Sequence, residues 1–283
     1  MIPVLKDVLA WRVMRVLLLA VALSLAGCGD GSGDDSETVV AAFYPLAWAA
    51  EQIAAEETEV VNLTPPGAEP HDVELSPRDA ETIREAHLVI YAGGGFQPAV
   101  EDAVSGREGL SVDVLDGERD PHVWLDPVRF AEVGRKVGRA FERPDQAELL
   151  ADELMRLDAS FRRGLERCER RILITSHAAF GHLAARYGLT QLSLTGASPE
   201  AEPGPRELER LIDDVRASGA TTVFAEPLVS DRVAETVARE AGAEVAVLDP
   251  LEGLSADRLA AGEDYLTVMR ANLATLREAL ACR

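Results

Sequence analysis

Short apolar runs that alternate with longer helical segments are the feature that most constrains the fold of this chain. The runs have strand length and many β-branched residues, and they cover residues 38–43, 59–64, 87–93, 111–115, 171–176, 221–226 and 243–250. Helical spacing is found between most of them, at residues 45–56, 76–86, 204–219 and 230–242. Strands that alternate with helices predict an α/β fold with parallel sheets.

The middle of the chain breaks this alternation. No strand-like run occurs between Pro127 and Arg171, where the sequence is helical with one interruption at residues 142–145. Pro144 suits the first turn of a helix, and the segment that follows is long enough for a helix of about 35 Å. We therefore expect two lobes, residues 38–143 and 171–283, joined by one long spine helix over residues 144–170.

The N-terminus has the layout of an export signal. Lys6, Arg12 and Arg15 precede the apolar run at residues 16–27, which is too short to span a bilayer comfortably. The end of this run, "LSLAGC", resembles the bacterial lipobox, in which the cysteine, here Cys28, becomes the lipidated first residue of the mature protein. An ordinary signal peptide with a chance cysteine is the alternative.

The lipobox predicts where the mature chain resides. Residues 1–27 would be removed, and residues 28–37, rich in Gly, Ser and Asp, would form a flexible tether. We expect a protein anchored by lipid to the outer face of the bacterial cytoplasmic membrane.

The charge of the chain excludes one class of partner. The full sequence has 28 Lys and Arg against 49 Asp and Glu, and loss of residues 1–27 removes three basic residues and one acidic one. The mature chain then has 25 against 48, a net charge of −23. Such a surface repels nucleic acid, so a DNA- or RNA-binding role is not expected.

Two cysteines remain after Cys28, namely Cys168 and Cys282. An exported compartment permits a disulfide, which would fasten the C-terminal helix to the end of the central one. The alternative is a pair of buried thiols.

Three of the five histidines lie at the ends of predicted elements. His71 lies in a proline- and glycine-rich loop, His122 in "RDPHVWLDP", and His177 where a strand turns into a helix. In α/β folds ligands gather at the carboxyl ends of strands, which makes these three histidines candidates for one site. We interpret His87 as a structural or exposed residue and His182 as a packing residue.

Asp249, in "VLDPLEGL", adds a carboxylate at another strand end. Three neutral imidazoles and one carboxylate would form a four-coordinate site suited to Zn²⁺, and imidazole disfavours Mg²⁺ and Ca²⁺. Glu226 or Asp126 could orient the ring N–H groups from behind. A turn aspartate before a proline is the alternative interpretation of Asp249.

Taken together, these motifs resemble the metal-binding receptors of bacterial zinc and manganese ABC importers. The resemblance is carried by "PH" (70–71), "DPHVWLDP" (120–127), "SHAAFGHLAARYGL" (176–189), "FAEPLVS" (224–230) and "LDPLEGL" (248–254). It implies one metal ion in the cleft between two lobes, bound by His71, His122, His177 and Asp249. It also implies a monomeric lipoprotein, not an enzyme, that delivers the metal to a membrane permease.

The third histidine bears on the choice of metal. Manganese-type members of the family tend to have glutamate at the position of His177, so the resemblance favours Zn²⁺, with a receptor for Mn²⁺ or Fe²⁺ as the alternative. A zinc hydrolase with Glu226 as general base is a rival from another class, but Asp249 would close the open position and the sequence has no H-E-x-x-H motif. A surface adhesin is a further rival, for which the sequence identifies no host ligand.

Overall fold

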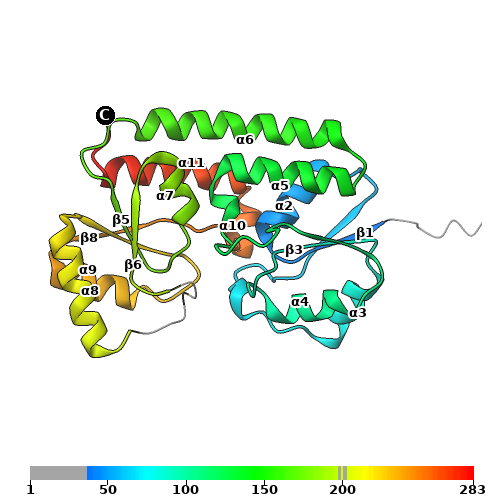
Figure 1. The fold of residues 1–283 in the computed structure, drawn as a ribbon, viewed down its shortest axis with the longest axis horizontal. Coiled ribbons are helices and arrows are strands. Elements are labelled where there is room, and N and C mark those ends of the chain that lie inside the picture. The colour runs from blue at the N-terminus through cyan, green and yellow to red at the C-terminus, as the bar shows by residue number, and fades with distance from the viewer. Residues whose placement is uncertain (1–36, 197–198, 200–202) are drawn as a thin grey trace, which may run out of the picture. The chain divides into compact units, whose positions relative to one another are not determined.

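A computed structural model describes residues 37–196, 199 and 203–283, and residues 37–283 belong to one compact unit. The unit contains two four-stranded parallel sheets (Figure 1). The first sheet has the order β2-β1-β3-β4, with β1 (Thr38–Ala41), β2 (Glu59–Asn62), β3 (Leu88–Tyr91) and β4 (Leu110–Asp113). The second has the order β6-β5-β7-β8, with β5 (Ile172–Thr175), β6 (Thr190–Ser193), β7 (Thr222–Ala225) and β8 (Glu244–Val247). The predicted α/β class with parallel sheets is confirmed.

Helices connect the strands in both halves. Those of the first half are α2 (Tyr44–Ile53), α3 (Pro77–Glu85) and α4 (Pro98–Ser105). Those of the second half are α7 (Gly181–Tyr187), α8 (Pro205–Ser218), α9 (Arg232–Ala241), α10 (Ala256–Ala260) and α11 (Tyr265–Ala279). Among the described residues, no helix is both long enough and apolar enough to cross a membrane.

Two antiparallel helices, α5 (Pro127–Ala140) and α6 (Pro144–Leu165), occupy the middle of the chain (Figure 1). Helix α6 has 22 residues, about 33 Å, and packs against α2 of the first half and against α7 and α11 of the second. Its buried face carries apolar residues at helical spacing, such as Leu150, Leu154, Leu157 and Phe161. One helix thus supports both sheets.

Helix α6 ends at Leu165, five residues before the predicted end at Arg170. The guanidinium of Arg171 donates hydrogen bonds to the carbonyl oxygens of Leu165 (2.9 Å) and Glu166 (2.7 Å), which are left without partners at a helix end. Just beyond, Cys168 and Cys282 form a disulfide, so the chain after α6 is tied to the C-terminal segment. Of the two alternatives for these cysteines, the structure contains the bridge.

One hydrophobic core runs from the first sheet through α5 and α6 into the second half. At its centre the ring of Tyr265 on α11 stacks on Trp48 of α2, with centroids 4.7 Å apart. A smaller cluster lies between the second sheet and helices α8 and α9. The shared core holds the two halves against each other, which fixes the loops that follow their strands.

The predicted signal segment at residues 1–27, the lipidation site Cys28 and the tether up to Ser36 lie outside the described residues. These expectations remain predictions.

Candidate metal centre

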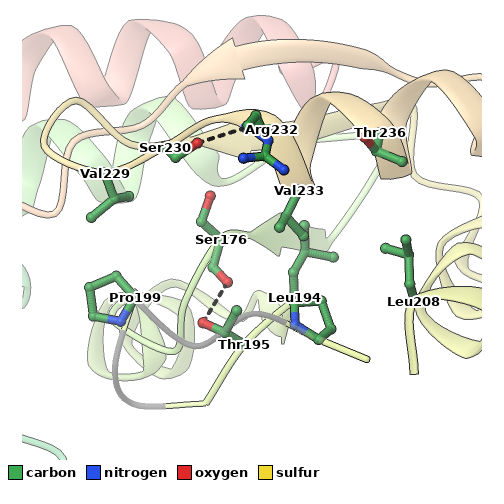
Figure 2. A pocket seen from close by; sticks show the side chains of 11 residues that line it. Ser176, Leu194, Thr195, Pro199, Leu208, Val229, Ser230, Arg232, Val233 and Thr236 are labelled. Atoms are coloured by element: carbon green, nitrogen blue, oxygen red, sulfur yellow. Dashed lines mark hydrogen bonds between the residues drawn. The ribbon is translucent and has the colours of Figure 1, made fainter. Parts of the chain in front are cut away.

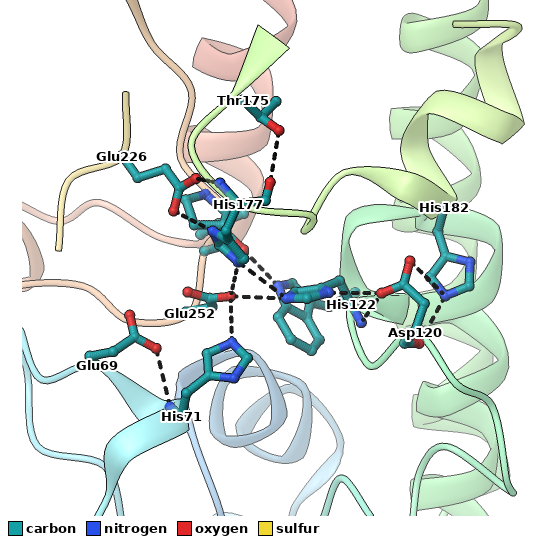
Figure 3. Close-up of polar contacts among 12 residues, drawn as sticks. Glu69, His71, Asp120, His122, Thr175, His177, His182, Glu226 and Glu252 are labelled. Atoms are coloured by element: carbon teal, nitrogen blue, oxygen red, sulfur yellow. Dashed lines mark hydrogen bonds and ion pairs between the residues drawn. The ribbon is translucent and has the colours of Figure 1, made fainter. Parts of the chain in front are cut away.

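Four side chains from four separate loops meet at one point (Figure 3). Each belongs to a loop that follows a parallel strand: His71 after β2, His122 after β4, His177 after β5 and Glu252 after β8. His71 lies within the 3₁₀ turn Pro70–Asp72, and His122 directly precedes a second such turn. Because all these loops leave the carboxyl ends of strands, the two sheets bring them together, as expected for α/β folds.

The four donor atoms all lie within 4.8 Å of one another, and Glu252 Oε1 is close to all three histidines. Glu252 Oε1 lies 3.1 Å from Nε2 of His122 and of His177, and 3.3 Å from Nε2 of His71. The Nε2 atoms of His122 and His177 are 3.4 Å apart. Zinc ligands about 2.0–2.1 Å from the metal in a tetrahedron are about 3.3–3.4 Å from one another. The four side chains are therefore spaced to hold one ion of the size of zinc.

The cluster is withdrawn from water. His122 and His177 are fully buried, Glu252 is 1% exposed, and the side chain of His71 is 11% exposed. A carboxylate buried to this extent is costly unless charges or hydrogen bonds compensate it, and here three imidazoles do so. His71 offers the most accessible edge of the site.

Two of the imidazoles are held by carboxylates at Nδ1, the ring nitrogen that points away from the cluster. His122 Nδ1 lies 2.7 Å from Asp120 Oδ1, and His177 Nδ1 lies 2.6 Å from Glu226 Oε2. A carboxylate can only accept, so Nδ1 carries the hydrogen in each ring and Nε2 faces the cluster. The backbone N–H of each histidine donates to the same carboxylate that holds its ring.

His71 is held differently. Its ring meets Phe96 edge-on, with centroids 4.5 Å apart, and its backbone N–H donates to Glu69 Oε1 at 3.1 Å. The other oxygen of Glu69 is buried and has no hydrogen-bond partner within the described part of the chain. Burial, together with the nearby charge of Glu252, raises the pKa of Glu69 to about 8.

The carboxylates also control the charge of the imidazoles. Burial alone would lower the pKa of His177, but hydrogen bonds to Glu226 and Glu252 outweigh it and raise the pKa to about 10. The pKa of His122 is raised in the same way against burial, by Asp120 and Glu252. For Glu252, burial opposes the charged form, yet its histidine partners hold the pKa well below the usual value. At neutral pH the proton on His177 therefore offsets part of the negative charge of the buried carboxylates.

The structure corrects the predicted fourth ligand. Asp249 Oδ2 accepts from Arg258 Nη1 at 2.6 Å, and Asp249 Oδ1 accepts from the backbone N–H of Leu251 at 2.7 Å. Both oxygens are thus engaged outside the cluster, and Glu252 takes the place assigned to Asp249. Asp249 instead caps its own turn two residues on, which is the turn interpretation left open for this aspartate before a proline.

Of the two residues that were predicted to orient the histidine rings, one does so and the other does not. Asp126 caps α5 and pairs with Arg186 at 2.8 Å instead of orienting a histidine ring. Glu226 holds the ring of His177, as predicted. Asp120, two residues before His122 in the same motif, holds the ring of His122 and was not among the predicted residues. His182 donates from Nε2 to the carbonyl oxygen of Asp120 at 3.0 Å and so supports the residue that holds His122.

A separate pocket of about 240 Å³ lies at the carboxyl end of the second sheet (Figure 2). Ser176, Ser230 and Arg232 supply its main polar groups, among apolar residues such as Leu194 and Val233. No histidine and no carboxylate is among the described residues that line it. The described part of its lining therefore offers no ligands for a metal.

The sequence of the chain matches a known family and named relatives. The family profile described as ZnuA, zinc-uptake complex component A, periplasmic, matches residues 39–279. The zinc-binding protein AdcA of Streptococcus pyogenes serotype M1 is 31% identical over 84% of this chain and 55% of its own length. The high-affinity zinc uptake system protein ZnuA of Bacillus subtilis (strain 168) is 30% identical over 93% of this chain and 96% of its own. The chain spans about half the length of the AdcA relatives.

Solved structures resemble the fold closely. The zinc-bound ZnuA-like domain of Streptococcus pneumoniae AdcA has a TM-score of 0.73 and 30% identity, covering 87% of this chain and 99% of that one. The laminin-binding protein Lmb of Streptococcus agalactiae, described as bifunctional with adhesin and metal-transporting activity, has a TM-score of 0.77 and 26% identity. That comparison covers 87% of this chain and all of Lmb.

Proposed function

The chain belongs to the family of zinc-uptake complex component A, and on this premise we propose that it is an extracytoplasmic receptor for Zn²⁺. It binds one ion through His71, His122, His177 and Glu252 and delivers it to the permease of an ABC importer. The observation that carries the proposal is the spacing of the four buried donor atoms, with three edges of 3.1–3.3 Å around Glu252 Oε1.

The donor set supports zinc as the cargo. Three imidazole nitrogens and one carboxylate oxygen suit a borderline-soft ion in tetrahedral geometry, whereas Mg²⁺ and Ca²⁺ require more oxygen ligands. Because both Asp249 and Glu252 offer a carboxylate, the choice of Glu252 as fourth ligand leaves the donor set at three nitrogens and one oxygen. Mn²⁺ or Fe²⁺ is the alternative cargo, and the names of the AdcA and ZnuA relatives favour zinc.

Capture exchanges protons for metal. The imidazole of His177, which its carboxylate partners keep protonated, must lose a proton before Nε2 can bind zinc, so binding releases a proton. The bound ion then replaces the released proton as the positive charge that neutralises the buried carboxylates. Because His71 and His122 follow strands of the first sheet, and His177 and Glu252 follow strands of the second, the ion links the two halves of the molecule.

The location and the partner are parts of the same proposal. Cys28, as the lipidated residue, would keep the receptor at the outer face of the membrane, close to its permease. The relative from Streptococcus pneumoniae is named a zinc-binding lipoprotein, which supports this reading. We propose that the mature chain works as a monomer that hands zinc over to the permease.

The rival functions gain less support. A zinc hydrolase needs an open coordination position, and Glu252 fills the fourth one. Adhesion is described for Lmb, but no feature of the described residues here specifies a host ligand.

A metal titration tests the proposed function. A soluble form beginning after Cys28 contains the whole compact unit and can be stripped of metal, then titrated in parallel with Zn²⁺ and Mn²⁺. We expect one tight zinc equivalent in the wild type and in His87→Ala, a control at an exposed histidine. His177→Ala should lose more affinity than the roughly 10–100-fold typical of removing a ring-orienting partner.

The outcomes separate the parts of the proposal. Tighter binding of Mn²⁺ than of Zn²⁺ would overturn the cargo but leave the receptor class standing. The absence of a tight site for either ion would overturn the function.

A further inference from the structure

The backbone directly before Glu252 has an uncommon conformation. Leu251 has a φ of +57°, in the left-handed region that disfavours residues with a β-carbon, and its side chain is fully buried. Three other described non-glycine residues have a positive φ, and none of them is buried: Asp116, Glu142 and Ala281. A strained residue in a packed interior persists only where its surroundings impose the conformation.

The surroundings of Leu251 do impose it. Its backbone N–H donates to Asp249 Oδ1 at 2.7 Å. The side chain of Asn272 clamps the backbone of Asp249 on both sides, accepting from its N–H (3.0 Å) and donating to its carbonyl oxygen (2.7 Å). Trp124 Nε1 donates to the carbonyl oxygen of Pro250 at 2.7 Å. Buried side chains therefore anchor each of the three residues before Glu252.

Asp249 itself is fixed by a cation. Its second oxygen accepts from Arg258 Nη1 at 2.6 Å, and Arg258 is held from its other side by Glu263 at 2.8–2.9 Å. One carboxylate oxygen is thus assigned to Arg258 and the other to the N–H of Leu251. Asp249 is 5% exposed, so water does not compete freely for either bond.

This turn delivers the glutamate to the cluster. Glu252 is the next residue after Leu251, and its Oε1 is the atom that reaches all three histidines. A ligand whose backbone is already fixed loses less freedom when it binds, which favours affinity. We propose that Asp249, held by Arg258, is a positioning residue that imposes the left-handed turn at Leu251 and so presents Glu252 to the metal. The inference rests on the proposed function, because Glu252 must be a zinc ligand.

The first test compares two buried aspartates. Asp249→Ala should lower zinc affinity by about 10–100-fold, the usual effect of removing a residue that orients a ligand. Asp158→Ala is the matched control, because Asp158 is equally buried and pairs with Arg162 at 2.7 Å on α6, away from the cluster. Asp158→Ala should keep wild-type zinc affinity even if its unfolding temperature falls as much as that of Asp249→Ala.

The second test asks whether the effect passes through Glu252. In a Glu252→Ala background, Asp249→Ala should change the remaining zinc affinity by less than about 2-fold, because the ligand that it positions is gone. An equal loss in both backgrounds would mean that Asp249 acts through general stability, and would overturn the inference. Unchanged zinc affinity for Asp249→Ala in the wild-type background would overturn it as well.

A second variant acts on the same carboxylate through its cationic partner. Arg258→Met frees the Asp249 carboxylate without removing it, and should lower zinc affinity in the same direction by a smaller factor, again only when Glu252 is present. A wild type without a tight zinc site would overturn the proposed function and this inference together. A tight wild-type site with unaltered binding in Asp249→Ala and Arg258→Met would overturn the positioning role alone.

Discussion

At the scale of single residues, the three histidines differ in what fixes their rings. His122 and His177 each give an Nδ1 hydrogen to a carboxylate, whereas His71 packs against Phe96. The carboxylates hold a hydrogen on Nδ1 of each ring, so Nε2 is the nitrogen that is left to bind a metal once it has no proton. Each carboxylate also binds the backbone N–H of its histidine, which couples the ring to its loop.

Glu226→Gln tests this arrangement. One of the two acceptor oxygens becomes an NH₂ group, so the side chain can no longer accept from both the ring and the backbone N–H of His177. We expect zinc affinity to fall by about 10–100-fold in a competition titration. Glu235→Gln, at an exposed position on α9, is the control and should bind like the wild type. Equal affinity for the two variants would contradict the orienting role.

The raised pKa values predict how zinc binding depends on pH. A pKa of about 10 for His177 means that its imidazole is protonated at neutral pH and must release a proton to bind zinc. Apparent affinity should therefore rise with pH by roughly tenfold per unit for each proton released, and the rise should continue above pH 7. Titrations between pH 6 and 9 measure this slope. A plateau from pH 7 upward would show that the imidazoles are already neutral there.

The ligand set shows what the sequence can and cannot predict at this scale. The three histidines could be singled out because each lies at the end of a predicted element, His71 and His122 among prolines and His177 where a strand turns into a helix. Asp249 and Glu252 lie three residues apart after the same strand, and pattern alone cannot decide between them. The choice depends on Arg258 and on the left-handed backbone at Leu251, neither of which leaves a local signal.

At the scale of elements, strong local patterns were predictable and weak ones were not. Apolar β-branched runs correctly located seven of the strands. The predicted runs were one to four residues longer than the strands, and the run at residues 111–115 also began one residue after the strand does. The eighth, β6 (Thr190–Ser193), was missed because its sequence, "TQLS", is polar and lies at the edge of the sheet, where burial does not require apolar side chains. The end of α6 depends on Arg171, which caps it from outside the helix.

The disulfide gives a prediction about the end of α6. Replacing Cys168 and Cys282 by serine opens a link between residues 114 positions apart and should lower the free energy of unfolding by about 2–5 kcal/mol. Zinc affinity should stay unchanged, because neither cysteine belongs to the cluster. Chemical denaturation of the metal-free proteins measures the first quantity and metal titration the second. A loss of zinc binding without a loss of stability would contradict this separation.

At the scale of the whole described unit, the four-residue cluster and the core join the same two halves. Helix α6 and the continuous core connect the sheets on one side, and the four-residue cluster connects their loops. The two-sheet plan with a helical middle was accessible from the sequence, since it follows from the long strand-free stretch. The continuity of the core across both halves was not, because it depends on contacts such as that between Trp48 and Tyr265.

Zinc should therefore stabilise the fold as a whole. Free Zn²⁺ at about 100 times its dissociation constant adds about 2.7 kcal/mol to the free energy of unfolding if only the folded state binds it. Thermal unfolding of stripped and zinc-loaded protein measures the shift, which Mg²⁺ should not reproduce. His177→Ala should show little stabilisation by zinc at the same concentration. An equal shift in that variant would place the stabilising ion elsewhere.

X-ray absorption at the zinc edge of protein loaded with one equivalent tests the ligand set most directly. We expect four light-atom ligands at about 2.0–2.2 Å, with the outer-shell scattering of three imidazole rings. In Glu252→Ala, the carboxylate ligand should be lost or replaced by water, and the scattering of the three imidazoles should remain. In Asp249→Ala, the scattering of the three imidazoles should also remain. A spectrum with fewer than three imidazoles, with sulfur, or with a six-oxygen shell would contradict the assignment of zinc to this cluster.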